Sequence, residues 1–323
     1  MRVVTTVHTR PLVRPFPVSH MTTSAVDLVT LELSTRDSVV GAGEISADAG
    51  YDQDGPAIAA QANGLAETLA ADPDSTDPGR LDARLRTAAV SAPARMLVEM
   101  AFLDRAARLR GLPVWRLLGL PEPGIVGLVT TVPIGAPLPA AGPVKVKLGG
   151  PDDAAVLRDL VGVRGPVILD VNRGWTRADW LALRPLVIAV APAVLEDPVA
   201  DPALLRGIRA ALPATAMVLD EGIGSQADVE RAAETAGGAN VKVMKLGGLL
   251  PARRALDHLT ARGATRMLGC YLEPPRAIAY AAQLSGRADW TDLDGHFWVS
   301  PDHPAVPAYR LDSSRPGIPT ITF

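Results

Sequence analysis

Three acidic residues end successive apolar segments in the middle of the chain. Asp170 closes VILD, Glu196 closes AVLE and Asp220 closes MVLD. If these segments are neighbouring parallel strands, the carboxylates point toward one axis, where like charges raise their pKa values unless a cation lies between them. Oxygen ligands without nearby histidine or cysteine suit Mg²⁺, with Mn²⁺ as a substitute. The pattern predicts one divalent-metal site per subunit.

Lysines flank these acids on both sides. Lys145 and Lys147 alternate in VKVKL and therefore face the same side of a strand, whereas Lys242 lies in NVKVMK and Lys245 is expected to face elsewhere or lie in a loop. An ammonium beside Mg²⁺ or a second ammonium has a lowered pKa. A lysine shifted from about 10.4 toward 7–8 can act as a general base. Lys147 and Lys242 are thus candidates for proton transfer on opposite faces of a bound molecule, with Lys145 lowering the pKa of Lys147.

Further polar residues accompany the acids. Asn172, Asp197 and Glu221 each lie one or two positions after an acid, so they are candidates to orient the ligands or to pair with a lysine. Lys245 is a further candidate for such a supporting role. Residue types alone leave another interpretation open. The acids could be independent helix caps or partners of the many arginines.

The spacing of these residues predicts the elements that carry them. Five polar residues at the ends of apolar runs are separated by 22 to 26 residues, namely Lys147, Asp170, Glu196, Asp220 and Lys242. One strand, one helix and two short loops take about this length, and regular β/α units favour a closed barrel with reactive residues at the C-terminal strand ends. A doubly wound sheet is the alternative, but the nucleotide-binding motifs G-x-G-x-x-G and G-x-x-x-x-G-K-[ST] are absent from the sequence.

The N-terminal third has a different pattern. Residues 3–10 and 26–33 alternate polar and β-favouring side chains, which predicts antiparallel strands. Residues 41–55 are glycine-rich and predict a loop between a strand and a helix, while residues 56–71 and 78–118 have helical spacing. These elements indicate a small α+β domain.

The expected fold class is therefore α/β: a closed parallel β/α barrel with a small N-terminal α+β domain. We expect the α+β domain to span residues 1–120 and the barrel residues 121–298. The tail from about 299 to 323 is expected to return to the N-terminal domain.

Composition limits the function classes. Hydrophobic residues make up 48% and charged residues 21% of the chain, so a large core is possible and global disorder is excluded. The net charge of −3 argues against a nucleic-acid or membrane partner and leaves a small molecule. Cys270 is the single cysteine, which excludes an intramolecular disulfide. The first residues form no apolar leader, so a cytoplasmic protein is expected.

The motifs together resemble the muconate-lactonizing subgroup of the enolase superfamily. K-x-K at 145–147, D-x-N at 170–172, E-D-P at 196–198, D-E at 220–221 and K-x-x-K-x-G-G at 242–248 match that subgroup in order and spacing. The resemblance implies a modified TIM barrel of the (β/α)7β type, with the N-terminal α+β domain as its capping domain. It also implies that Asp170, Glu196 and Asp220 bind Mg²⁺ and that Lys147 and Lys242 form the acid/base pair around an ene-diolate.

The C-terminal part is most similar to the dipeptide epimerases. This resemblance rests on NVKVMKLGGL, MLGCYLEPP and WTDLDGHFW. It implies that Asp292 and Asp294 bind the α-ammonium of the substrate, with Thr131 and Lys145 as further substrate contacts. The implied reaction is Mg²⁺-dependent epimerisation of L,L-dipeptides to L,D-dipeptides, by 1,1-proton transfer at the α-carbon of the C-terminal residue.

Several alternatives remain at this point. The same scaffold carries o-succinylbenzoate synthases and N-acylamino acid racemases, and a non-catalytic small-ligand-binding barrel is a more remote alternative. Loops at 15–25 and 50–55, with Phe16, His20 and Tyr51, are expected to cap the site and select the side chain, and Arg14 or His20 would favour an acidic substrate. A homo-oligomer is compatible with the sequence.

Overall fold

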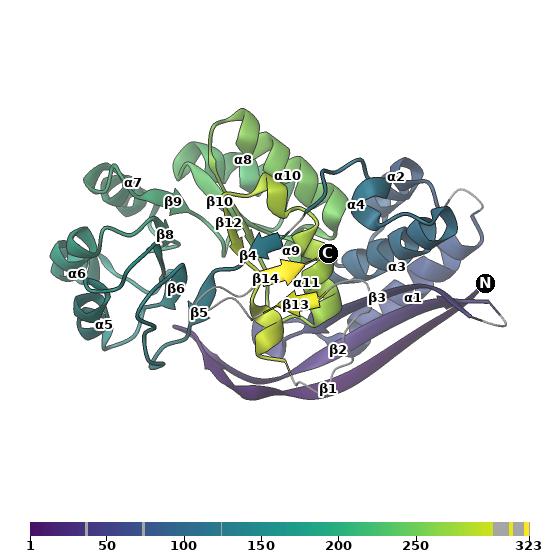
Figure 1. The fold of residues 1–323 in the computed structure, drawn as a ribbon, viewed down its shortest axis with the longest axis horizontal. Coiled ribbons are helices and arrows are strands. Elements are labelled where there is room, and N and C mark those ends of the chain that lie inside the picture. Colours follow the sequence, from purple (N-terminus) through teal and green to yellow (C-terminus); the bar gives the residue numbers. More distant parts are fainter. Residues whose placement is uncertain (36–37, 73–74, 124, 300–309, 313–319, 323) are drawn as a thin grey trace.

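The computed structural model describes residues 1–35, 38–72, 75–123, 125–299, 310–312 and 320–322. Figure 1 shows a long antiparallel β-ribbon at one edge of the molecule, a group of helices above one end of it, and a ring of short strands with outer helices above the other end. The predicted fold class is confirmed: an N-terminal α+β capping domain is joined to a parallel β/α barrel.

The capping domain contains a three-stranded antiparallel sheet in the order β1-β2-β3. Its strands are β1 (Arg2–Pro17), β2 (Thr22–Ser34) and β3 (Val39–Ala47). Its helices are α1 (Gly55–Ala70), α2 (Pro78–Thr87), α3 (Ala92–Arg110) and the single turn α4 (Val114–Leu117). The helical region predicted over 78–118 is thus divided into three helices. Ala88 with an extended backbone ends α2, and Gly111 with φ +60° ends α3.

The predicted loop over residues 41–55 is partly wrong, because its first seven residues belong to β3. A Cβ atom at Gly41 would lie 2.4 Å from the Ala101 carbonyl oxygen, and one at Gly43 would lie 2.4 Å from that of Leu97. These glycines therefore allow α3 to lie directly on the strand rather than forming a turn. The connection to α1 is confined to residues 48–54, which include the 3-10 turn η1 (Ala49–Tyr51).

The barrel is a ring of eight parallel strands. A five-stranded sheet β5-β6-β7-β8-β9 and a three-stranded sheet β10-β11-β12 make up the ring. A parallel bridge from Leu219 to Ala239 joins β9 to β10, and the Val129 N–H donates to the Thr291 carbonyl oxygen between β5 and β12. The strands are β5 (Thr130–Val132), β6 (Val144–Lys147), β7 (Val167–Asp170), β8 (Val194–Glu196), β9 (Ala216–Val218), β10 (Gly238–Lys242), β11 (Thr265–Gly269) and β12 (Trp290–Asp292).

Helices cover the outside of this ring. They are α5 (Asp153–Leu160), α6 (Arg177–Val190), α7 (Pro202–Ala211), α8 (Gln226–Thr235), the single turn α9 (Val243–Leu246), α10 (Leu249–Ala261) and α11 (Pro275–Ala282). Where the (β/α)7β pattern places a helix after β5, residues 133–143 contain no helix and are mostly irregular. Four prolines in this segment explain the difference, because proline breaks a helix interior.

Two observations fix the capping domain to the barrel. Buried side chains of α1 and α3 belong to one continuous hydrophobic core with those of α9, α10 and α11. At the other end, a Cβ atom at Gly149 would lie 2.8 Å from the Ser19 Cβ, so the β1–β2 turn rests on the loop that follows β6. The capping domain thus covers the C-terminal ends of the barrel strands.

The C-terminal segments lie near the start of the barrel. β13 (Arg310–Asp312) and β14 (Thr320–Thr322) form an antiparallel sheet with β4 (Ile125–Gly127). Val299 makes an antiparallel bridge with Leu12 of β1. The rest of the predicted tail lies outside the described residues. In the part of the chain described, no helix has the length and apolar character needed to span a membrane.

Candidate active site

The four lysines of the chain all lie at one place. Lys145 and Lys147 are on β6, Lys242 ends β10, and Lys245 is in α9 directly after it. Their ammonium groups contact the predicted acidic residues at the C-terminal ends of the barrel strands. The regular β/α repeat brings these groups together, as in other parallel barrels.

Lys145 is at the centre of the charged cluster. Its Nζ lies 2.9 Å from Asp170 Oδ2, 2.8 Å from Glu196 Oε2 and 2.7 Å from Asp292 Oδ2, and its side chain is 1% exposed. Burial lowers the pKa of Lys145, but the three carboxylates outweigh burial and raise it well above its usual value. The three carboxylates therefore favour the charged form of Lys145.

Lys147 is bound to the first of the acids. Its Nζ donates to Asp170 Oδ2 at 2.6 Å and to Asn172 Oδ1 at 3.3 Å. Burial lowers the pKa of Lys147 and so do Lys145 and Lys242, but Asp170 outweighs them and the pKa is raised. Lys145 acts in the predicted direction, yet the charges of the chain alone do not give Lys147 the lowered pKa that the sequence led us to expect.

Asp220 binds two lysines from the other side of the ring. Lys242 Nζ lies 2.8 Å from Asp220 Oδ2, and Lys245 Nζ donates to Asp220 Oδ1 at 2.8 Å. Burial lowers the pKa of Lys242, but Asp220 raises it well above its usual value. Lys245 does not face elsewhere as expected, because β10 ends at Lys242 and the turn α9 brings the side chain three positions later back to Asp220.

Three further predicted residues hold the backbone near Asp220. Asp197 accepts hydrogen bonds from the backbone N–H groups of Asp220 at 2.7 Å and Glu221 at 2.5 Å. Asn172 donates to Glu221 Oε1 at 2.9 Å. Asn172 and Asp197 have φ values of +47° and +39°, which are uncommon for non-glycine residues. These hydrogen bonds can hold Asp220 and its neighbour in a fixed orientation.

Asn240 was not selected from the sequence. It is fully buried in β10, its Nδ2 donates to Glu196 Oε1 at 2.8 Å, and its Oδ1 has no hydrogen-bond partner among the described residues. Asn240 lies two positions before Lys242, so strand alternation places both side chains on the same face. That alternation is the signal that could have found it.

The three acids have the chemistry of a metal site, although lysines separate them. Asp170, Glu196 and Asp220 are completely buried, and Glu196 Oε2 and Asp220 Oδ2 contact the ammonium groups of Lys145 and Lys242, each at 2.8 Å. Burial, together with Asp170, raises the pKa of Glu196 to about 8. Among the described residues, no three acids, histidines or cysteines already surround a common point. The donor set suits Mg²⁺ once the ammonium groups of Lys145 and Lys242 move aside.

A small cavity of about 50 Å³ lies above the acids. Lys147 and Lys242 both line it. Because β6 and β10 are four strands apart in a ring of eight, the two amines approach the cavity from opposite sides of the barrel. The capping domain closes it with Phe16, Val18, Met21, Thr23 and Tyr51.

Asp292 and Asp294 form one wall of this cavity with Thr131. The Thr131 N–H donates to Asp294 Oδ2 at 2.6 Å, and Thr131 Oγ1 donates to Asp294 Oδ1 at 3.0 Å and to Asp292 Oδ1 at 3.2 Å. Burial and the neighbouring Asp292 raise the pKa of Asp294 to about 7. A cation bound at this wall would relieve the repulsion between the two carboxyl groups.

Comparison with known families agrees with this arrangement. Residues 1–119 match the N-terminal domain of mandelate racemase and muconate lactonizing enzyme, and residues 141–306 match the enolase C-terminal domain-like family. The chain belongs to the mandelate racemase/muconate lactonizing enzyme family of the enolase superfamily. Both halves of the molecule match, so the membership covers the cap as well as the barrel.

The family members most similar to this chain include dipeptide epimerases. A hydrophobic dipeptide epimerase from Roseobacter litoralis is 30% identical over 71% of this chain and 74% of its own length. The L-Ala-D/L-Glu epimerase of Escherichia coli is 29% identical over 90% of this chain and 92% of its own. A dipeptide epimerase from Enterococcus faecalis, solved with Mg and L-Leu-L-Tyr, shares the fold with a TM-score of 0.83 at 20% identity, covering 99% and 96% of the two chains.

A pair of tyrosines separates the small cavity from a larger one in this member of the family. Tyr51 and Tyr271 meet edge to face with ring centroids 4.8 Å apart, and Lys242 Nζ lies 4.6 Å from the Tyr271 ring centroid. Both tyrosines also line a neighbouring cavity of about 480 Å³ together with Glu221 and Lys245. Tyr271 directly follows the barrel segment RMLGC, and its type alone gave no sign of this role.

Glu273 gives a testable pH dependence. It is 2% exposed and accepts a hydrogen bond from the Tyr271 N–H at 2.9 Å, and burial raises its pKa from 4.5 to about 7. Its contribution to stability is therefore fully present below about pH 4.5 and is lost as the pH rises to about 7. Relative to Glu273→Gln, the free energy of unfolding of the unmodified protein should fall by about 3 kcal/mol over this interval. Urea unfolding at pH 4.5 and pH 8 measures the difference, and equal pH slopes for both proteins would contradict it.

Proposed function

We propose that this chain is a Mg²⁺-dependent dipeptide epimerase that interconverts L,L- and L,D-dipeptides at the α-carbon of the C-terminal residue. The observation that carries the proposal is the position of Lys147 and Lys242, which line one cavity from opposite sides. Inversion at carbon needs a proton acceptor on one face and a proton donor on the other. The similarity to dipeptide epimerases supports the same reaction.

In the proposed reaction, one lysine takes the α-proton and the other returns a proton to the opposite face. Asp170, Glu196 and Asp220 would hold Mg²⁺, which supplies positive charge to stabilise the negative charge that develops on the substrate carboxylate. Lys147 has its ammonium paired with Asp170, and Lys242 with Asp220, so the lysine that acts as base must first lose a proton.

The acidic wall favours a dipeptide over substrates of the alternative enzymes. Asp292 and Asp294 are buried, and Lys145 is the one ammonium that contacts the pair among the described residues. A free α-ammonium complements this wall, whereas the acyl group of an N-acylamino acid or a succinylbenzoate precursor offers no positive charge.

Asp294→Asn tests this assignment. The substituted amide keeps an acceptor for Thr131 but removes the negative charge, and Asp294 has no described lysine or arginine partner that the change would release. We expect kcat/KM for L,L-dipeptides to fall about 10- to 100-fold, mostly through KM, because a charged hydrogen bond is lost. The same dipeptides with an acetylated N-terminus serve as the control and should lose little further activity. Equal losses for both substrate sets would contradict the assignment.

The cavity lining favours an apolar substrate side chain. Phe16 and Trp298 meet at a centroid distance of 4.6 Å, and Val18, Met21 and Leu272 complete an apolar wall. Arg14 and His20, which the sequence suggested for an acidic substrate, are both exposed and are not among the residues that line the cavity.

We therefore expect dipeptides with an apolar C-terminal side chain to have a kcat/KM at least about 10-fold above that of matched glutamate-containing dipeptides. The reason is that burying a carboxylate without a partner is costly. Parallel assays of L-Ala-L-Leu, L-Ala-L-Phe and L-Ala-L-Glu measure the ratio. A preference for the glutamate substrate would refute the expectation.

A screen of L,L-dipeptides with Mg²⁺ in D₂O tests the function itself. Deuterium at the C-terminal α-carbon is read by mass, and the L,D-product by chiral separation. Exchange and inversion are separate readouts, because one lysine can return a solvent deuteron to the face it deprotonated, whereas inversion needs both lysines. Dehydration of a succinylbenzoate precursor, or racemisation of N-acylamino acids without dipeptide turnover, would favour the alternatives.

A further inference from the structure

A buried carboxylate in the capping domain contacts the barrel behind Lys242. Glu99 lies in α3 and is 1% exposed. Its Oε2 accepts hydrogen bonds from the Leu249 N–H at 2.5 Å and from the Tyr280 hydroxyl at 2.6 Å, and its Oε1 accepts from the Leu250 N–H at 3.3 Å. All three donors belong to the barrel, so this one side chain links the two domains.

Glu99 caps a helix that has no cap of its own. Leu249 and Leu250 are the first residues of α10, and the preceding Gly248 offers no side-chain cap. The free N–H groups of a helix start favour a negative charge, which Glu99 supplies from another domain. A Cβ atom at Gly248, where φ is +140°, would lie 2.2 Å from Glu99 Oε2. The second glycine of the K-x-x-K-x-G-G motif thus makes room for this carboxylate.

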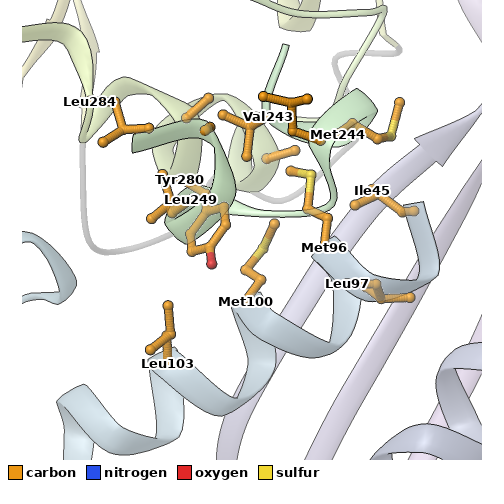
Figure 2. Packing of buried hydrophobic residues seen from close by; sticks show 14 of the residues in the cluster. Ile45, Met96, Leu97, Met100, Leu103, Val243, Met244, Leu249, Tyr280 and Leu284 are labelled. Carbon is orange, nitrogen blue, oxygen red and sulfur yellow. The ribbon is translucent and has the colours of Figure 1, made fainter. Parts of the chain in front are cut away.

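A short hydrogen-bonded unit connects this cap to Lys242. Lys242 precedes the turn α9, and the Gly247 and Gly248 N–H groups both donate to the Val243 carbonyl oxygen at 3.0 Å. Figure 2 shows Met96 and Met100 of α3 pointing toward Val243, Met244 and Leu249, with the Tyr280 hydroxyl directed toward α3. This unit restrains the backbone between the start of α10 and Lys242.

The charge of Glu99 is costly for the fold. Burial raises its pKa to about 7, although Tyr280 and the two backbone donors act in the opposite direction. Ionisation of Glu99 therefore carries a net desolvation cost. A neutral side chain would avoid this cost, which points to a role in placing the groups around it rather than in stability alone.

We propose that Glu99 is a positioning residue for Lys242: it fixes the start of α10 from the capping domain and so sets the approach of the Lys242 amine to the substrate. The inference rests on the proposed epimerase function. Lys147 lies on the opposite side of the ring, on β6, and reaches the cavity without this connection. Loss of Glu99 should therefore slow proton transfer on the Lys242 face of the α-carbon more than on the Lys147 face.

The test uses Glu99→Ala and Glu99→Gln in the full chain, with a dipeptide and Mg²⁺ in D₂O. Inversion should slow about 10- to 100-fold in Glu99→Ala, as for misplacement by about 1 Å. Exchange with retention, in the epimer whose α-proton faces Lys147, should change much less, so the ratio of exchange to inversion rises about 10-fold or more. Glu99→Gln keeps the shape of the side chain and should show a smaller rise in the same direction.

Asp104→Asn is the matched control. Asp104 lies on the same helix and accepts the Ala42 N–H at 2.9 Å, within the capping domain. Its substitution should leave the ratio of exchange to inversion unchanged.

A purely structural role for Glu99 would lower exchange and inversion together, and an unchanged ratio in both Glu99 variants overturns the inference. If Glu99→Ala does not fold, Glu99→Gln and Tyr280→Phe decide. Absence of exchange in the unmodified enzyme would instead overturn the proposed function, and this inference with it.

Discussion

Replacing Lys147 by alanine is expected to reduce dipeptide epimerisation by at least about 10³-fold, which is the scale of a lost general acid or base. Lys242→Ala should have the same effect on inversion. The two variants should differ in exchange. Each should retain solvent exchange only in the epimer whose α-proton faces the remaining lysine. Mass and chiral analysis in D₂O measure both rates for each epimer.

The main risk in these variants is the charge that they leave behind. Lys147→Ala removes an ammonium 2.6 Å from the buried Asp170, which then keeps Lys145 at 2.9 Å as its one cationic partner among the described residues. Loss of one partner of a buried charge destabilises a fold. Lys147→Arg keeps a positive charge but cannot act as a base, because arginine stays protonated. It should fold and remain inactive in inversion, whereas Arg206→Ala, at an exposed position, should retain full activity. Inversion by Lys147→Arg at the rate of the unmodified enzyme would refute the assignment.

Removal of divalent metal is expected to cause the second large loss, at least about 10³-fold in inversion, reversed by added Mg²⁺. Asp170, Asp220 and Glu196 raise the pKa of Lys145, and Asp170 and Asp220 raise those of Lys147 and Lys242. A dication bound to these acids lowers the lysine pKa values. A lysine base works when deprotonated, so the acid limb of the pH profile should move to lower pH as Mg²⁺ approaches saturation.

The same ion pairs predict that chelation leaves the protein folded. Lys145, Lys147 and Lys242 already neutralise the carboxylates, so circular dichroism after EDTA treatment should match that of the untreated protein. Glu196→Gln should bind less Mg²⁺, measured by calorimetry, and exposed Asp159→Asn should bind as before. Full activity in EDTA, or an acid limb that does not move with Mg²⁺ concentration, would contradict this account.

The barrel and its charged residues could be predicted because they follow a simple repeat. A strand and a helix of nearly constant length recur along the chain, so polar residues at strand ends return to one edge. Strand alternation then selects Lys145 with Lys147 on a common face. The same rule covers Asn240 and Lys242, although a buried amide among apolar residues attracts less attention than a charge.

Other features depend on contacts that spacing does not reveal. Gly41 and Gly43 suggest a loop until α3 is placed against them, and the prolines in residues 133–143 remove a helix that the repeat predicts. Glu99 looks like an ordinary helical residue, because its partners are 150 and 181 positions away in Leu249 and Tyr280. Whether the pKa of each lysine is raised or lowered also depends on its distances to the neighbouring charges, which the sequence does not give.

The confinement of lysine to one place has a practical consequence for spectroscopy. Lysine and arginine together number 32, and all of them except Lys145, Lys147, Lys242 and Lys245 are arginines. Selective isotope labelling of lysine would therefore give side-chain resonances from these four amines alone, with no background from the outer surface. Titration of those resonances would follow ionisation and ligand binding directly, without mutation or an attached probe.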